Sequence, residues 1–232
     1  MLCQAGGSWD YQQESGSGPR HWHGQCATGK AQSPINIVGA EAATLPDWRW
    51  SGYTSQLTQI RVKNTGHSLK LELGEGGGAV PRLAGADLPG QFIFAQAHFH
   101  WGNTSGRGSE HLVDGRASPL ELHLVHYNAK YGSLTEAVTH RDGLAVVGVL
   151  HKLTAEDSPA LAGLVGAADR VTRARSNTTL QTALQLRSLL PADLDTFYRY
   201  SGSLTTPGLP TPAFHQTPTK TLDDLKHTKQ TP

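Results

Sequence analysis

The sequence predicts a mainly β domain with a few short helices, and three observations support this. The chain of 232 residues contains 26 glycines and 13 prolines, and both residues favour turns and short strands over long helices. Several segments alternate apolar and polar residues, which is the period of a strand with one buried face. Signals for the start of a helix occur at two places, and both helices are short.

The clearest strand patterns lie in the middle of the chain. Residues 56–73 contain two strand candidates around the turn Asn64-Thr65-Gly66, and the second candidate alternates leucine with polar residues. Residues 91–101 are aromatic and alternating, and residues 120–127 form another candidate. Residues 144–150 are continuously apolar, which predicts a central strand buried on both faces.

The helix signals are local. Ser133-Leu134-Thr135-Glu136 fits a capping box. Ser158 offers an N-cap and Pro159 a first helical residue ahead of residues 160–171. Residues 1–30, rich in glycine and aromatic residues, are expected to form an irregular arm.

Charge and composition exclude several classes of protein. The net charge is +1, so we expect no nucleic-acid partner. No run of about 18 apolar residues occurs, so no membrane span is expected. The first residues lack the basic and apolar regions of an export signal, so the chain as given is expected in the cytoplasm. The two cysteines, Cys3 and Cys26, could pair, but we favour free thiols because there are so few.

A group of histidines predicts a metal site. His98 and His100 are two residues apart on an expected strand, so their side chains point to the same face. A single such pair is more often structural. His123 on the next strand supplies a third imidazole, and Glu121 lies on the same face, where it could hold that ring. Three neutral imidazoles with one open position are typical of a catalytic Zn²⁺ site.

Several ordered motifs show that the sequence resembles the alpha class of carbonic anhydrases. The resemblance runs from about Trp9 to Gly208, and one departure is Ser118, where the family usually has an aromatic residue. The motifs are Trp9-Asp10-Tyr11, His21-Trp22, Gln32-Ser33-Pro34-Ile35-Asn36-Ile37, Asn64-Thr65-Gly66-His67, His98-Phe99-His100-Trp101-Gly102, Ser109-Glu110-His111, Glu121-Leu122-His123-Leu124-Val125-His126 and Gly202-Ser203-Leu204-Thr205-Thr206-Pro207.

The resemblance implies a large twisted, mostly antiparallel sheet with short peripheral helices, and zinc at the base of a conical cleft. It implies that His98, His100 and His123 bind the zinc. Thr205 would accept a hydrogen bond from the zinc-bound hydroxide and donate one to Glu110. These two hydrogen bonds would orient the hydroxide toward CO₂.

The resemblance also implies supporting roles for other residues. His67 would be the proton shuttle, since an imidazole with a pKa near 6.5 can pass a proton to buffer. Thr206 would contact bicarbonate, and Gln96 and Glu121 would orient zinc ligands. The apolar surface where CO₂ rests would consist of Val125, Val146 and Leu204.

The resemblance ends after Gly208. We therefore expect a catalytic domain over residues 7–208, incomplete at its C-terminal end, and a divergent, disordered tail over residues 209–232. Pro210 and Pro212 cannot supply the ladder donors of the central strand that the family has here. The missing part normally supports the equivalent of His100.

Two features indicate the extracellular branch of the family. Cys26 matches the first cysteine of a disulfide in that branch, and the position of the second is Leu209. Asn103-Thr104-Ser105 and Asn177-Thr178-Thr179 are glycosylation sequons. A secreted protein is therefore expected from the family branch, although the start of this chain has no export signal.

The predicted function is the zinc-dependent reversible hydration of CO₂ to bicarbonate and a proton by a monomer. The first alternative is a zinc-binding chain that is weakly active or inactive and acts as an interaction protein. Another is a zinc hydrolase that acts on small esters. A binding module that has lost zinc is disfavoured by the intact histidine triad.

Overall fold

The computed structural model describes residues 9–12, 14–207, 215–216 and 219–221, and the fold is reported for these residues. The strands are β1 (Asn36–Ile37), β2 (Arg49–Ser51), β3 (Ile60–Asn64), β4 (Leu69–Leu73), β5 (Arg82–Ala84), β6 (Phe92–Trp101), β7 (Leu112–Val113), β8 (Leu120–Asn128), β9 (Leu144–His151), β10 (Asn177–Thr179), β11 (Ser201–Gly202), β12 (His215–Gln216) and β13 (Thr219–Thr221). The α-helices are α1 (Gln25–Thr28), α2 (Leu134–Ala137) and α3 (Pro159–Ala168), and the 3-10 helices are η1 (Pro19–His21), η2 (Ala129–Tyr131) and η3 (Leu186–Leu189).

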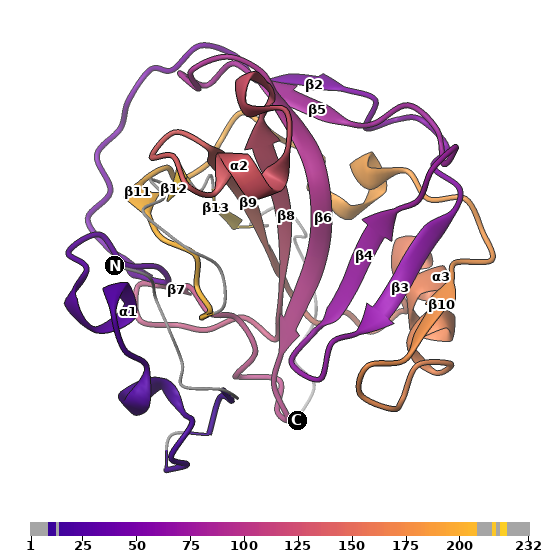
Figure 1. Ribbon diagram of the computed structural model, residues 1–232, viewed down its shortest axis with the longest axis horizontal. Helices are drawn as coiled ribbons and strands as arrows, with labels where there is room; N and C mark the ends of the chain where they lie inside the picture. The colour runs from indigo at the N-terminus through magenta and orange to yellow at the C-terminus, as the bar shows by residue number, and fades with distance from the viewer. Residues whose placement is uncertain (1–8, 13, 208–214, 217–218, 222–232) are drawn as a thin grey trace.

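One curled sheet dominates the molecule (Figure 1). Its main path runs β10-β3-β4-β6-β8-β9-β12-β11, and β5 joins β2 to β6 at one end. The pairs from β10 to β9 are all antiparallel, while β12 and β13 run parallel to β9. A separate small sheet pairs β1 with β7 in parallel. The predicted mostly antiparallel sheet with short peripheral helices is confirmed.

The expected strands are present. The alternating segments at residues 91–101 and 120–127 form β6 and β8, and the turn after β3 leads into β4. In β9 every residue from Leu144 to Leu150 is buried, which confirms a central strand covered on both faces. The long run of β6 and β8 side by side is clear at the centre of Figure 1.

A bulge in β6 changes which residues face the core. The register with β8 shifts between Phe94 and Gln96, so one extra residue is inserted. Before the bulge the buried side chains are Phe92 and Phe94, and after it they are Ala97 and Phe99. Because side chains alternate along a strand, the shift turns Gln96 and the two histidines that follow to the opposite face.

The main hydrophobic core lies on the other face of the sheet from these histidines. Its buried members on the long strands include Ala97, Phe99, Leu122 and Leu124. Two segments cover this face: α3, which supplies Leu164 and Ala167, and η3 with its flanking residues, which supplies Leu184, Leu186, Leu189 and Leu190. The three histidines and the main core therefore lie on opposite faces of β6 and β8, although Val125 is an apolar residue on the histidine face and His126 a buried polar residue on the core face.

The helix signals are realised in part. The Ser133 hydroxyl accepts a hydrogen bond from the Glu136 backbone N–H at 3.2 Å, so the N-terminal cap of α2 is confirmed. Pro159 is the first residue of α3, as expected, but the Ser158 side chain makes no capping hydrogen bond. Proline suits the first position because its missing N–H would have no partner within the helix.

The two ends of the described chain differ from expectation. The N-terminal arm contains η1 and α1 between irregular segments, and Cys26 is disulfide-bonded, so the prediction of a free thiol there is wrong. Cys3 lies outside the described residues. In the segment expected to be a disordered tail, five described residues form β12 and β13 against β9, because β9 offers them an edge with free backbone groups.

The described part of the chain holds no helix of the length and apolar character that crossing a bilayer requires. The rest of residues 209–232 lies outside the described residues, so the disordered tail remains a prediction there.

The core makes a prediction about stability. Leu122 is fully buried, whereas Leu153 is 65% exposed. Leu122→Ala should lower the free energy of unfolding by about 2–5 kcal/mol, since it removes buried methyl groups and leaves a cavity. Leu153→Ala is the matched control and should change it by less than about 0.5 kcal/mol. Urea unfolding followed by tryptophan fluorescence measures both, and equal losses would contradict the assigned core.

Candidate metal centre

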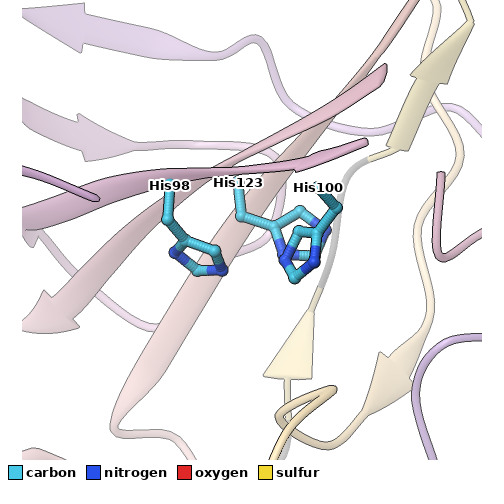
Figure 2. A group of neighbouring side chains, drawn as sticks. All are labelled: His98, His100 and His123. Atoms are coloured by element: carbon cyan, nitrogen blue, oxygen red, sulfur yellow. The ribbon is translucent and has the colours of Figure 1, made fainter. Parts of the chain in front are cut away.

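Three histidines from two neighbouring strands meet on the polar face of the sheet. In the antiparallel register of β6 and β8, His98 lies directly opposite His123, and His100 opposite Glu121. One ring nitrogen from each of the three histidines lies within 4.8 Å of the others. Figure 2 shows the three rings on the same side of the strands that carry them. This spacing suits one metal ion bound by all three rings.

Two of the rings have one nitrogen occupied by a protein oxygen. Gln96 Oε1 accepts a hydrogen bond from His98 Nδ1 at 2.9 Å. Glu121 Oε1 accepts one from His123 Nε2 at 2.6 Å. These contacts leave His98 Nε2 and His123 Nδ1 for a metal, since a ligating histidine commonly donates its other N–H to such an oxygen.

The third ring is the most enclosed by polar groups. His100 is buried, and its Nδ1 lies 3.3 Å from Glu110 Oε1. Its Nε2 is buried with no hydrogen-bond partner in the described structure. An orphaned buried nitrogen is costly unless something binds it, and a metal ion shared with His98 and His123 would satisfy it. The donor set therefore fits a zinc ion, which prefers imidazole nitrogen.

Burial keeps two of the rings neutral. Desolvation lowers the pKa of His98 well below its usual value, and the nearby imidazoles of His123 and His100 lower it further. Desolvation and His123 lower the pKa of His100 to about 3. Desolvation acts in the same sense on His123, but the Glu121 carboxylate outweighs it and raises the pKa of that ring. Neutral imidazole is the form that binds a metal.

Glu121 connects several residues of the site through hydrogen bonds. It is fully buried, and its carboxylate accepts four hydrogen bonds: from His123 Nε2, from His111 Nδ1 at 2.6 Å, and from the backbone N–H groups of Glu110 and His111 at 2.8 and 2.9 Å. His111, Glu121 and His123 could also be taken for a metal-binding group, but these hydrogen bonds already use the facing atoms.

The network continues away from the metal centre to the loop that carries Thr205. The Tyr200 hydroxyl lies 2.6 Å from His111 Nε2 and 2.7 Å from Ser33 Oγ. The Tyr200 hydroxyl donates to Ser33 Oγ, so it links that serine to the ring of His111. Ser33 and Ser203 are joined by two further hydrogen bonds of 2.9 and 3.0 Å.

Glu110 lies between the metal ligands and Thr205. Its Oε2 is 3.8 Å from His123 Nδ1. Burial raises the pKa of Glu110, while the charge of His123 and a hydrogen bond from Thr205 act to lower it. The structure thus brings together two of the three residues that the resemblance assigns to catalysis, Glu110 and Thr205.

His67, the third, lies apart from them in the turn before β4. Its ring stacks on Trp9 with centroids 3.9 Å apart and planes 11° apart. It is exposed to solvent.

The apolar residues of the expected CO₂ surface are partly brought together. Val125 and Val146 are buried and lie opposite each other in the register of β8 and β9. Val125 is also opposite Gln96 on β6, on the face of the metal ligands. Leu204 is half-buried and packs on a small second core of Ala137, Val138 and Leu144. Thr206 lies in the bend that follows Thr205.

Sequence reasoning did not assign a role to Tyr200 or Ser33. These residues are 167 positions apart in the chain, so no local spacing could have linked them. Ser33 lies within one of the family motifs, which is the only signal that could have drawn attention to it.

Comparison with known proteins gives the family. The model of the eukaryotic-type carbonic anhydrases matches residues 17–212, which is most of the chain. The chain belongs to the eukaryotic-type carbonic anhydrase family. It is 38% identical to carbonic anhydrase 7 of Homo sapiens over 205 residues, which cover 87% of this chain and 75% of that protein.

Two further carbonic anhydrases are similar to the chain. Carbonic anhydrase 15 of Mus musculus is 35% identical over 212 residues, covering 87% of this chain and 65% of that protein. Carbonic anhydrase 4 of Rattus norvegicus is 35% identical over 197 residues, covering 83% and 62%. The chain therefore spans somewhat less than two thirds of these two carbonic anhydrases.

The network beneath the metal centre makes a prediction for this carbonic anhydrase. Tyr200→Phe should lower the free energy of unfolding by about 1–3 kcal/mol, since it leaves His111 Nε2 without its partner in a buried site. Tyr198→Phe is the control, because no hydrogen bond of the Tyr198 hydroxyl is found within the described residues. Chemical denaturation of both variants tests this, and a Tyr200→Phe variant as stable as the parent would contradict the network.

Proposed function

We propose that this carbonic anhydrase homologue binds zinc through His98, His100 and His123 and catalyses the reversible hydration of CO₂. The observation that carries the proposal is the pattern of free ring nitrogens. Each histidine has one nitrogen near a protein oxygen and a second that can bind a metal, and one ring nitrogen of each histidine lies within 4.8 Å of the others. That arrangement offers three imidazole ligands and leaves further coordination positions open.

Zinc, when bound by three imidazoles, supplies Lewis acidity that lowers the pKa of a bound water to about 7, as is known for carbonic anhydrase. The protein's own contribution is orientation. An ionised Glu110 carboxylate has no proton to donate, so it can act only as a hydrogen-bond acceptor. The Thr205 hydroxyl therefore donates a hydrogen bond to Glu110. The Thr205 oxygen then acts as an acceptor toward the reacting oxygen and holds it in one orientation.

Other residues support binding and proton release in this proposal. Val125, Val146 and Leu204 would form the apolar surface for CO₂, and Thr206 would contact bicarbonate. His67 would carry the proton to buffer, and its exposure and its stacking on Trp9 suit a group that exchanges protons with solvent. Gln96 and Glu121 would hold the rings of His98 and His123.

Removing a ligand tests the zinc-dependent activity. His123→Ala should lose stoichiometric zinc, measured by metal analysis, and its CO₂ hydration in stopped-flow assays should fall to the uncatalysed background. His140→Ala removes a histidine whose side chain is 39% exposed on the surface and should keep both properties. A parent protein no faster than His123→Ala would refute the enzyme and favour a zinc-binding interaction protein.

Thr205 can be tested separately from the metal. Thr205→Val is close in shape and lacks the hydroxyl, so the variant should retain zinc while its rate of CO₂ hydration falls by about 100-fold, the usual scale for lost positioning. Zinc content and kcat/KM measured on one preparation separate the two effects. An unchanged rate would show that Thr205 does not orient the reacting oxygen.

A further inference from the structure

A strip of charged side chains lies on the same face of the sheet as the metal centre. In the register of β4 and β6, Lys70 is directly opposite His98. In the register of β3 and β4, Lys63 is opposite Lys70, and Arg61 is opposite Glu72. Side chains alternate along each strand, and the intervening Val62 and Leu71 are buried in the core. The four charged residues therefore stand on the polar face.

The strip carries an excess of positive charge. Three of its members are cations and one is an anion, so its formal charge is +2, whereas the whole chain has a net charge of +1. Lys70 Nζ lies 2.6 Å from Glu72 Oε1. Burial acts to raise the pKa of Glu72, but the charges of Lys70, Lys63 and Arg61 act to lower it, and the lowering prevails.

This arrangement is unfavourable for folding by itself. Like charges directly opposite each other in an antiparallel pair destabilise the sheet, and Lys63 faces Lys70 in this way. On the outer side, β10 places the uncharged Asn177 and Thr179 opposite Lys63 and Arg61, so that strand adds no compensating carboxylate. The remaining positive charge is available to an anion that approaches along this face.

The strip is close enough to influence the metal centre. Lys70 stands directly opposite the candidate ligand His98 on the neighbouring strand. The nearest carboxylates at the centre, Glu110 and Glu121, are buried and face the histidines and Thr205. A divalent cation at the centre would neutralise the negative charges of these two carboxylates, so they would not repel an anion near Lys70.

We propose that Lys70, with Lys63 and Arg61 behind it, forms an electrostatic recruitment site for the anionic substrate, bicarbonate, beside the metal centre. This inference rests on the proposed function and adds the residues that attract the anionic substrate. Glu72 sets the strength of the site, because its carboxylate holds Lys70 and cancels part of the charge. Lysine and arginine on a face next to a reaction centre raise the local concentration of anions and the rate at which they arrive.

Anion binding by the zinc-loaded protein tests the site, with nitrate as an inert monovalent probe in titration calorimetry. At an ionic strength of about 10 mM, Lys70→Gln should raise the Kd for nitrate and the KM for bicarbonate by about threefold, the scale of one charge acting across partly screened solvent. Lys70→Gln combined with Lys63→Gln should raise both by about tenfold. Glu72→Gln should change both in the opposite direction.

Two control variants separate charge from structure. Lys70→Arg keeps the charge and should behave like the parent. Arg170→Gln removes a cation that follows α3, on the opposite face, and should leave both constants unchanged. The differences should shrink at about 0.5 M salt, where the Debye length is only a few ångströms. Because the overall equilibrium is fixed, kcat/KM for CO₂ and for bicarbonate must change together, so nitrate affinity is the decisive measurement.

The outcomes distinguish this inference from the proposed function. Nitrate affinity that is the same in Lys70→Gln and Glu72→Gln, or that changes in the same direction in both, would overturn the recruitment site even if CO₂ hydration is fast. A zinc-loaded parent without CO₂ hydration, but with opposite shifts in the two variants, would overturn the enzyme and keep the anion site.

Discussion

The burial of one ionised carboxylate, Glu121, is the constraint on which the metal centre depends. A carboxylate removed from water is strongly destabilising unless its oxygens are fully hydrogen-bonded. Four donors surround this one, two of them backbone N–H groups of the segment before β7 and two of them imidazoles. Burial acts to raise the pKa of Glu121, yet His123 and His111 lower it well below its usual value. The Glu121 carboxylate thereby holds a loop, the ring of the candidate ligand His123 and the ring of His111 in place.

The same hydrogen bonds connect distant parts of the chain. His111 is hydrogen-bonded to Tyr200, and Tyr200 is hydrogen-bonded to Ser33. Ser33 is in turn hydrogen-bonded to Ser203, which precedes Leu204 and Thr205 in the chain. Gly202 shows how tightly this region is packed, since a Cβ there would lie 2.1 Å from Ser33 Oγ. These contacts hold the loop that carries Thr205 in one position relative to the strands below it.

Much of the fold followed from local patterns, and the errors have identifiable causes. Alternation located β4, β6 and β8, and a continuous apolar run located β9, because burial on one or both faces dictates those periods. The state of Cys26 was mispredicted, since disulfide pairing depends on which residues meet in space and not on their number. The strands of the C-terminal segment were not expected because β12 and β13 have only two and three residues, too few to show a pattern, and the edge of β9 supplies their pairing.

The sequence by itself determined that His98 and His100 share a face, because residues i and i+2 on a strand point the same way, and it indicated His123 on the next strand as a third candidate ligand. It also determined which carboxylate stands beside His123. Only the tertiary structure decided that β6 carries a bulge between Phe94 and Gln96. The bulge places the histidines on the face opposite the core. The tertiary structure alone placed Lys70 opposite His98 and Ser33 beneath Tyr200, since pairing register and contacts between distant segments depend on the packing of the whole sheet.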